Sequence, residues 1–146
     1  MKQKLLTMAA TVAALMVMTV VTANAQAGAK LKAHVPFDFA AGQTRLRAGD
    51  YSVTRIARNA FLLRSADNKT SVIVQAPVAI EPGREGSPAR LVFKRYDQEY
   101  FLTQVWTYAS AEGRQLNTSR TEARLAGQWA QKNTPAQIVE VLARAK

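Results

Sequence analysis

The segment Ala89-Arg-Leu-Val-Phe-Lys-Arg-Tyr-Asp-Gln-Glu-Tyr-Phe-Leu-Thr-Gln-Val-Trp106 carries the densest run of aromatic and branched residues after the N-terminal leader. Such residues, interrupted by a short polar stretch, indicate a β-hairpin. With Asp97-Gln-Glu99 as the loop, Tyr96 is predicted to face Tyr100 and Leu91 to face Val105. This register also sets Thr103 opposite Phe93 and Arg95 opposite Phe101. The predicted core face carries Leu91, Phe93, Phe101 and Val105.

The second face of this hairpin is amphipathic, and a one-residue slip of the register would bury Lys94. Its aromatic residues are typical of two situations: a surface that binds a ligand, or ordinary cross-strand packing with Arg90 on Trp106 in a cation–π contact. The candidate binding surface consists of Arg90, Tyr96, Tyr100 and Trp106.

Upstream of the hairpin the chain predicts further strands. Residues 34–39 place Val35, Phe37 and Phe39 on one face, with pairing expected after Pro36 or at a sheet edge. Residues 51–56 form a second strand, and residues 61–65 and 71–75 a hairpin whose turn uses Asn68 in a left-handed conformation. The apolar runs of this hairpin predict strands covered on both faces. Residues 42–49 and 76–88 are expected to be loops, the latter a crossover rich in proline.

Downstream of the hairpin the chain predicts a helical segment over about residues 118–145. Ser119 and Glu122 have capping-box spacing, and good helix formers follow them. Thr134-Pro135 predicts the start of a second helix over 136–145, with Ile138, Val141, Leu142 and Ala145 on one stripe.

The first 25 residues read as a cleaved secretory signal peptide. Lys2 and Lys4 precede an apolar run from Leu5 to Val21, and Thr22-Ala23-Asn24-Ala25 supplies a small-residue cleavage site. The protein is therefore expected to be exported, either to the periplasm or outside the cell, with no transmembrane span after cleavage. Residues 26–33 are expected to be a flexible start, and residues 34–146 a single β-rich domain.

The composition narrows the function classes. The chain has no cysteine, which excludes disulfides, thiolate metal sites and thiol catalysis. Without Lys2 and Lys4 the chain keeps 18 basic against 10 acidic residues. An exported protein meets little nucleic acid, so this charge favours an anionic envelope surface as partner, or simply a solvated basic surface.

Recognisable catalytic equipment is missing from the sequence. His34 is the one histidine and is expected to point away from the core; Asp38 and Asp50 lie near turns, where a carboxylate accepts backbone N–H groups. No nucleophile elbow, phosphate loop or dinucleotide glycine pattern appears. We therefore predict no catalytic residues, no metal and no cofactor.

Several segments together resemble a family of small secreted proteins from soil bacteria. They are Val35-Pro-Phe-Asp-Phe39, Leu46-x-Ala-Gly-Asp-Tyr-x-Val53, Leu63-Arg-Ser-Ala-Asp67, Leu91-Val-Phe-x-Arg-Tyr96, Tyr100-Phe-Leu-x-x-Val-Trp106 and Ser119-Arg120. Relatives often have Pro at the position of Arg47 and Gly at the position of Asn68. Arg47 and Asn68 are both still compatible with a turn. The resemblance implies secretion and a shared β-fold, and it assigns no activity.

The sequence predicts a mainly β protein of about six strands, a small antiparallel sandwich or partly open barrel with one or two C-terminal helices. The leading functional hypothesis is a non-catalytic module that binds an anionic envelope component or a protein partner. The alternatives are a carrier of a small apolar ligand, in the manner of lipocalins, and an enzyme of unspecified class. The oligomeric state stays open.

Overall fold

The computed structural model describes residues 30–81, 87–108 and 112–145, which form strands and one helix. The predicted signal peptide lies outside the described residues. The elements are β1 (Lys30–Val35), β2 (Phe39–Ala41), β3 (Thr44–Leu46), β4 (Gly49–Ala57), β5 (Ala60–Ser65), β6 (Ser71–Gln75), β7 (Val78–Ile80), β8 (Arg90–Tyr96), β9 (Glu99–Trp106), β10 (Gly113–Gln115), α2 (Arg120–Gln131) and β11 (Gln137–Ala145).

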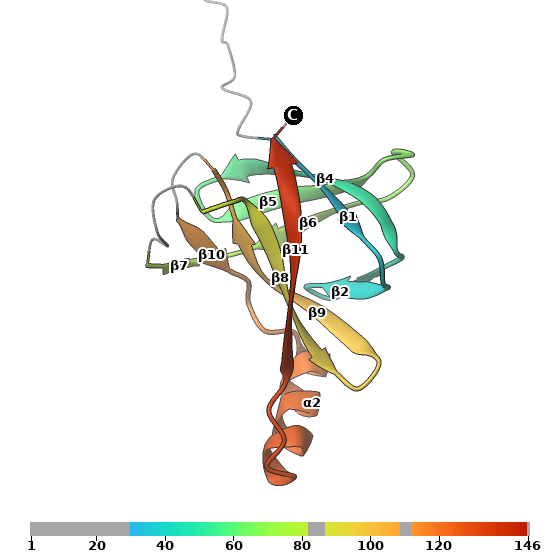
Figure 1. Cartoon of the computed structure of the whole chain (residues 1–146), viewed down its shortest axis with the longest axis vertical. Helices are drawn as coiled ribbons and strands as arrows, with labels where there is room; N and C mark the ends of the chain where they lie inside the picture. The colour runs from blue at the N-terminus through green and yellow to red at the C-terminus, as the bar shows by residue number, and fades with distance from the viewer. Residues whose placement is uncertain (1–29, 82–86, 109–111, 146) are drawn as a thin grey trace, which may run out of the picture.

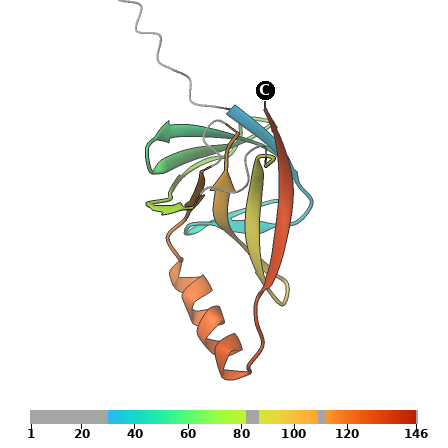
Figure 2. The ribbon, with the colours of Figure 1, turned by 60° about the vertical axis from the view of Figure 1, so that its left-hand side comes forward.

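The strands form one sheet that curls into a nearly closed barrel (Figures 1 and 2). Its main path runs β3-β2-β9-β8-β11-β1-β4-β5-β6, with antiparallel pairs except for the parallel contact of β2 with β9. β10 pairs with both β9 and β7, and only Ala76 and Pro77 separate β7 from β6. The backbone N–H of Asn117 also donates to the carbonyl of Gln75 (3.3 Å). The circuit of strands therefore closes through β6, β7 and β10.

The described sheet has 11 strands, where the sequence predicted about six. The difference comes largely from three-residue strands within segments that were read as loops or polar connections. β3 falls in the predicted loop 42–49, β7 in the predicted crossover 76–88, and β10 in the polar segment that follows Trp106. Such short strands carry too few residues to show an alternating pattern.

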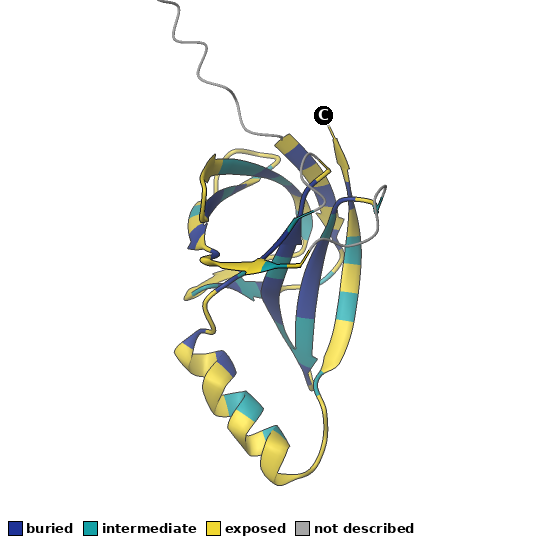
Figure 3. Ribbon diagram, turned by 90° about the vertical axis from the view of Figure 1, so that its left-hand side faces the viewer, coloured by how far each residue is buried: buried dark blue, intermediate teal, exposed yellow. Residues whose placement is uncertain are grey.

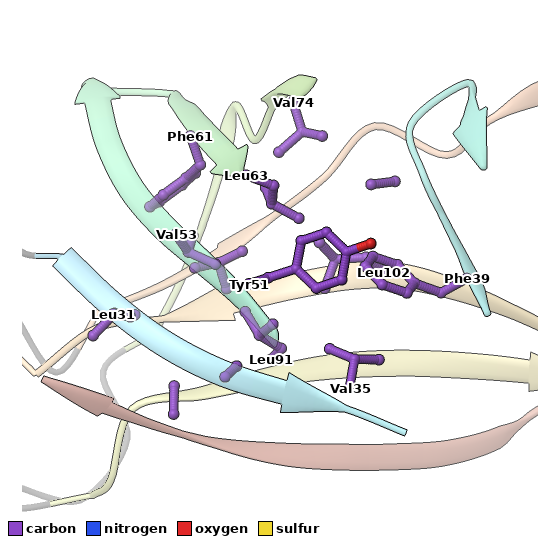
Figure 4. Close-up of a cluster of buried hydrophobic side chains, with 14 of the residues drawn as sticks. Leu31, Val35, Phe39, Tyr51, Val53, Phe61, Leu63, Val74, Leu91 and Leu102 are labelled. Atoms are coloured by element: carbon purple, nitrogen blue, oxygen red, sulfur yellow. The ribbon is translucent and has the colours of Figure 1, made fainter. Parts of the chain in front are cut away.

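Apolar side chains fill the inside of the barrel, as Figure 4 shows. The ring of Phe39 meets the rings of Tyr51 and Phe93 edge to face, each with centroids 5.3 Å apart. Successive side chains along β1, β4 and β5 point alternately into the barrel and away from it. The inward-pointing side chains are the apolar ones, so each strand has one apolar face. The largest side chains exposed by less than 2% are Phe39, Phe61, Phe93, Leu31, Leu46, Leu63, Leu91, Val35, Val53, Val74 and Val105.

The prediction of a flexible start over 26–33 and of a strand beginning at His34 was wrong for the described residues. Residues 30–35 form β1, which lies between β11 and β4. Leu31, Ala33 and Val35 point inward, and the lysines and His34 between them point outward. Pro36 follows the strand, because it cannot donate a hydrogen bond to a neighbour on either side.

The prediction of a helix over 136–145 was also wrong, because these residues form β11. Val139, Val141 and Ala143 alternate toward the core, and β11 pairs with β8 on one side and β1 on the other. The apolar residues of this segment match both the 3.6-residue period of a helix and the two-residue period of a strand. Its β-branched residues favour the pleated sheet over the helix. The helix α2 therefore stands between strands and does not end the chain.

The hairpin of β8 and β9 keeps its predicted outer register but shifts at a bulge. Leu91 pairs with Val105 and Arg90 with Trp106, as expected. Thr103 is then the extra residue, so Phe93 faces Leu102. Its hydroxyl donates to the carbonyl of Val92 (3.1 Å) and its own carbonyl accepts from the N–H of Leu116 (2.8 Å). The bulge reverses which side chains of β9 point inward beyond this point.

The helix α2 lies at one end of the barrel and extends away from it (Figures 2 and 3). Its predicted capping box is present: the hydroxyl of Ser119 accepts from the N–H of Glu122 (3.1 Å). The left-handed conformation predicted at Asn68 is present too, with φ 57°. The hairpin around Asn68 is covered on one face only, because Ile73 on β6 is 59% exposed.

Candidate functional site

The structure distributes the four residues of the predicted binding surface over different environments. Arg90 and Trp106 do form the predicted cation–π pair, with the guanidinium carbon 4.3 Å from the ring centroid. Trp106 is only 8% exposed, and its ring N–H donates to the side chain of Gln104 (2.9 Å). This pair is therefore packed within the sheet surface.

The two tyrosines lie on opposite faces of the hairpin, which corrects the predicted facing of Tyr96 and Tyr100. Tyr96 is buried beside Phe101 and beside Trp129 of α2, with ring centroids 6.0 and 5.7 Å away. Tyr100 stacks on Phe37 at 3.9 Å, and Phe37 in turn meets Phe93. The predicted loop Asp97-Gln-Glu99 was one residue too long, because Tyr96 pairs with Glu99 and only Asp97 and Gln98 form the loop. The bulge at Thr103 compensates for this one-residue offset, and Phe101 lies on the side of α2 and not on the predicted core face.

A different surface gathers exposed polar side chains: the outer face of β11, β1, β4 and β5. Because Leu31, Val53 and Leu63 point inward, the residues next to them in sequence point outward. The register aligns these outward residues across the strands, as Lys32 faces Arg144 on one side and Ser52 on the other, and Ser52 faces Arg64. We call the line Arg144, Lys32, Ser52 and Arg64 the basic row.

Among the described residues, the cations of the basic row have no carboxylate partner. In the part of the chain that the structure describes, the ion pairs are His34–Asp50, Arg45–Glu99, Arg90–Glu140 and Arg114–Glu112, and none includes a row residue. Lys32 and Arg144 stand directly opposite each other, an arrangement of like charges that destabilises a sheet. The row spans three strand spacings, about 14 Å. A bound anion would relieve this repulsion.

Three members of the basic row, Arg144, Lys32 and Ser52, line a hollow of about 1190 Å³ on the outer surface. Lys32 and Arg144 line the hollow with Lys30, and Tyr108 and Leu142 add apolar surface. It is open to solvent, and the core residues Ala33, Tyr51 and Ala143 also contribute to its wall.

One carboxylate stands inside this hollow and is bonded to the single histidine. The Nδ1 atom of His34 lies 2.8 Å from Oδ1 of Asp50, and both side chains are 68% exposed. His34 points away from the core as predicted. Asp50 was expected to accept backbone N–H groups, but that role falls to Asp38, which accepts from the N–H of Ala48 (2.8 Å). The Nε2 atom of His34 and the second carboxylate oxygen of Asp50 can each form a hydrogen bond with a ligand hydroxyl.

The His34–Asp50 pair requires the register of β1 against β4, which sets the two residues opposite each other. The sequence contains the alternation of β1 as a signal but no signal for this register. A catalytic role for the histidine needs a third group that it can activate. Within the described residues the hydroxyl nearest in the basic row, that of Ser52, donates to the carbonyl of Arg64 (3.4 Å).

Residues 30–81, 87–108 and 112–145 contain no cluster of three or more histidine, aspartate or glutamate side chains that could bind a metal ion. No helix in those ranges has the length and hydrophobicity needed to span a membrane.

Glu122 is a buried carboxylate in the first turn of α2, only 4% exposed as a residue. Burial raises its pKa above the ordinary value, and the charge of Lys94 and a backbone hydrogen bond from Ser119 lower it by less. The folded state therefore holds this proton at a pH where the unfolded chain has already released it. The stability that this proton contributes is present below the ordinary pKa of about 4.5 and is lost as pH rises through the raised value.

We expect Glu122→Gln to remove this pH dependence, because glutamine keeps the size and the capping-box geometry without the charge. Urea unfolding of both proteins across acidic to neutral pH measures it. The wild type should lose stability relative to the variant as the pH rises from below 4.5. Parallel curves for the two proteins would contradict the account of this carboxylate.

The fold and the outer hollow define the class of this protein: a mainly β, barrel-like domain with a filled interior and a basic concave outer surface. Scans against protein-family models, curated proteins and solved structures found no match.

Proposed function

We propose that this protein is an exported, non-catalytic binding module that holds a chain of an anionic envelope polymer in the hollow on the outer face of β11, β1 and β4. The basic row carries the proposal. Its three cations have no carboxylate partner among the described residues. Lys32 and Arg144 line the hollow and face each other, and Arg64 on β5 continues the row beyond it. The signal-peptide pattern and the resemblance to secreted proteins support the location.

The shape of the site favours a polymer chain over a lipid bilayer. The hollow is concave, and a flat bilayer surface cannot follow a concave wall. A single extended chain can lie along the row and place successive negative groups near Arg144, Lys32 and Arg64. Counterions released from such a chain would make the affinity fall as salt rises.

The filled interior favours outer binding over the alternative of an internal carrier. Leu63 and Phe93 belong to the barrel core, and Phe37 packs against it. A ligand carried inside in the manner of lipocalins needs space that these side chains occupy.

We expect the double variant Lys32→Gln/Arg144→Gln to bind an anionic polymer about 30-fold more weakly than the wild type. Each cation near an anionic surface contributes about 1 kcal/mol, and about 2 kcal/mol corresponds to this factor. The measurement is calorimetric titration with an oligomer of galacturonic acid at low and physiological ionic strength.

The matched control is Arg124→Gln/Lys132→Gln, which removes the same charge from exposed positions at α2. This control should keep nearly the wild-type affinity. Equal loss in both double variants would mean that net charge alone attracts the polymer, and would overturn the assignment to the basic row. Binding of the wild type to anionic vesicles with no affinity for the oligomer would favour a lipid surface instead.

A further inference from the structure

The hollow combines three features that a purely anionic ligand does not need. It has cations that no carboxylate of the described residues pairs with, a carboxylate paired with a histidine, and an exposed aromatic ring beside an exposed leucine. Each feature selects a chemical group, so their combination narrows the class of polymer.

The carboxylate of Asp50 discriminates against ligands that carry only negative groups. It lies on the same face of the sheet as Lys32, two residues before Ser52 on β4. A bare polyphosphate passing over the basic row would bring its charges close to this carboxylate and be repelled. Hydroxyl groups behave in the opposite way, because a carboxylate accepts hydrogen bonds from them.

His34 extends the same preference. Its Nδ1 atom is engaged with Asp50, and its Nε2 atom has no hydrogen-bond partner among the described residues. The second oxygen of Asp50 is likewise free of partners there. The pair therefore presents one ring nitrogen and one acceptor oxygen, and each can form a hydrogen bond with a hydroxyl group of a ligand.

Tyr108 supplies a ring at the other side of the hollow. It is 47% exposed, and its hydroxyl donates to the carbonyl of Ala143 (3.0 Å), which holds the ring against β11. Leu142 on β11 is 65% exposed and lines the same hollow. A ring tethered by its polar end leaves apolar surface for the C–H face of a ligand.

These observations lead us to propose that the polymer is a glycan whose sugar rings carry carboxylate or other anionic groups, with His34 and Asp50 binding its hydroxyls and Tyr108 packing against a ring. The inference rests on the proposed function, since the basic row still binds the negative groups. Polyphosphates lack the hydroxyls and the C–H faces. Lipid headgroups cannot enter the hollow as a chain.

The test compares three ligands on the exported protein: a galacturonic acid oligomer, an inorganic polyphosphate of equal charge and a neutral glucose oligomer. The wild type should bind the acidic glycan at least about tenfold more tightly than the polyphosphate, a difference of about 1.4 kcal/mol, and bind the neutral glycan weakly. Asp50→Asn should weaken glycan binding and strengthen polyphosphate binding, so that the ratio of the two affinities falls. Tyr108→Leu should weaken glycan binding alone.

Circular dichroism and the thermal midpoint establish that both variants fold, as expected for exposed positions. Equal affinity for the glycan and the polyphosphate, with both reduced by Lys32→Gln/Arg144→Gln, would overturn this inference and leave the proposed function standing. Unchanged glycan affinity in both Asp50→Asn and Tyr108→Leu would also overturn it. Failure of Lys32→Gln/Arg144→Gln to weaken any anionic ligand would instead remove the proposed function itself.

Discussion

Replacing Phe93 with alanine is expected to lower the free energy of unfolding by about 3–5 kcal/mol. The side chain of Phe93 is fully buried, and its ring meets the rings of Phe37 and Phe39 edge to face, at 5.1 and 5.3 Å between centroids. Removing it leaves a cavity that strands β8, β2 and their neighbours cannot close, because hydrogen-bonded partners hold them in place. Such a loss is a large share of the about 5–15 kcal/mol typical of a domain.

Urea unfolding followed by tryptophan fluorescence measures this loss. Ile73→Ala provides the control, because this residue is 59% exposed on the outer face of β6 and its truncation should cost much less. Similar losses in the two variants would show that the inside and outside of the barrel are not as described.

The second large effect is expected at Gly113, where any side chain collides with Trp106. A Cβ atom at Gly113 would lie 2.6 Å from two atoms of the indole ring. The ring cannot move away freely, since Arg90 stacks on it and Gln104 accepts its N–H. We expect Gly113→Ala to cost about 1–3 kcal/mol, the usual range for forcing extra atoms into a packed site.

Replacing a different glycine with alanine should change the free energy of unfolding in the opposite direction. A Cβ at Gly127 in α2 would meet no atom within 4 Å, and alanine is about 1 kcal/mol better than glycine in a helix interior. Gly127→Ala is therefore expected to stabilise the protein while Gly113→Ala destabilises it. In a Trp106→Leu background the penalty at Gly113 should shrink, since the two residues interact directly. A penalty that stays the same in that background would contradict the contact.

The parts of the fold that rest on local chemistry could be predicted from the sequence. Asn68 turns the β5–β6 hairpin, and Ser119 caps α2 through Glu122. Alternating apolar residues located Tyr51 and Val53 in the core. Each of these features depends on residues within a few positions of one another.

The parts that depend on distant partners could not be predicted. The apolar residues of 137–145 match both a helical and a strand period, and pairing with β8 and β1 decides for the strand. No glycine in the sequence indicates the bulge at Thr103. In the shifted register, Tyr96 and Tyr100 lie on opposite faces of the hairpin. The basic row was missed for the same reason, because it requires the register of four strands. The basic charge of the chain indicated an anionic partner but not where it binds.

The most direct test of the central claim is to map where an anionic glycan binds. Amide chemical shifts recorded by NMR during titration with a galacturonic acid oligomer would provide the map. The account predicts that the shifts concentrate on β11, β1, β4 and β5, around Lys32, Asp50 and Arg144. Shifts centred on Arg90 and Trp106, or spread evenly over all exposed cations, would contradict the assignment of the outer hollow as the binding site.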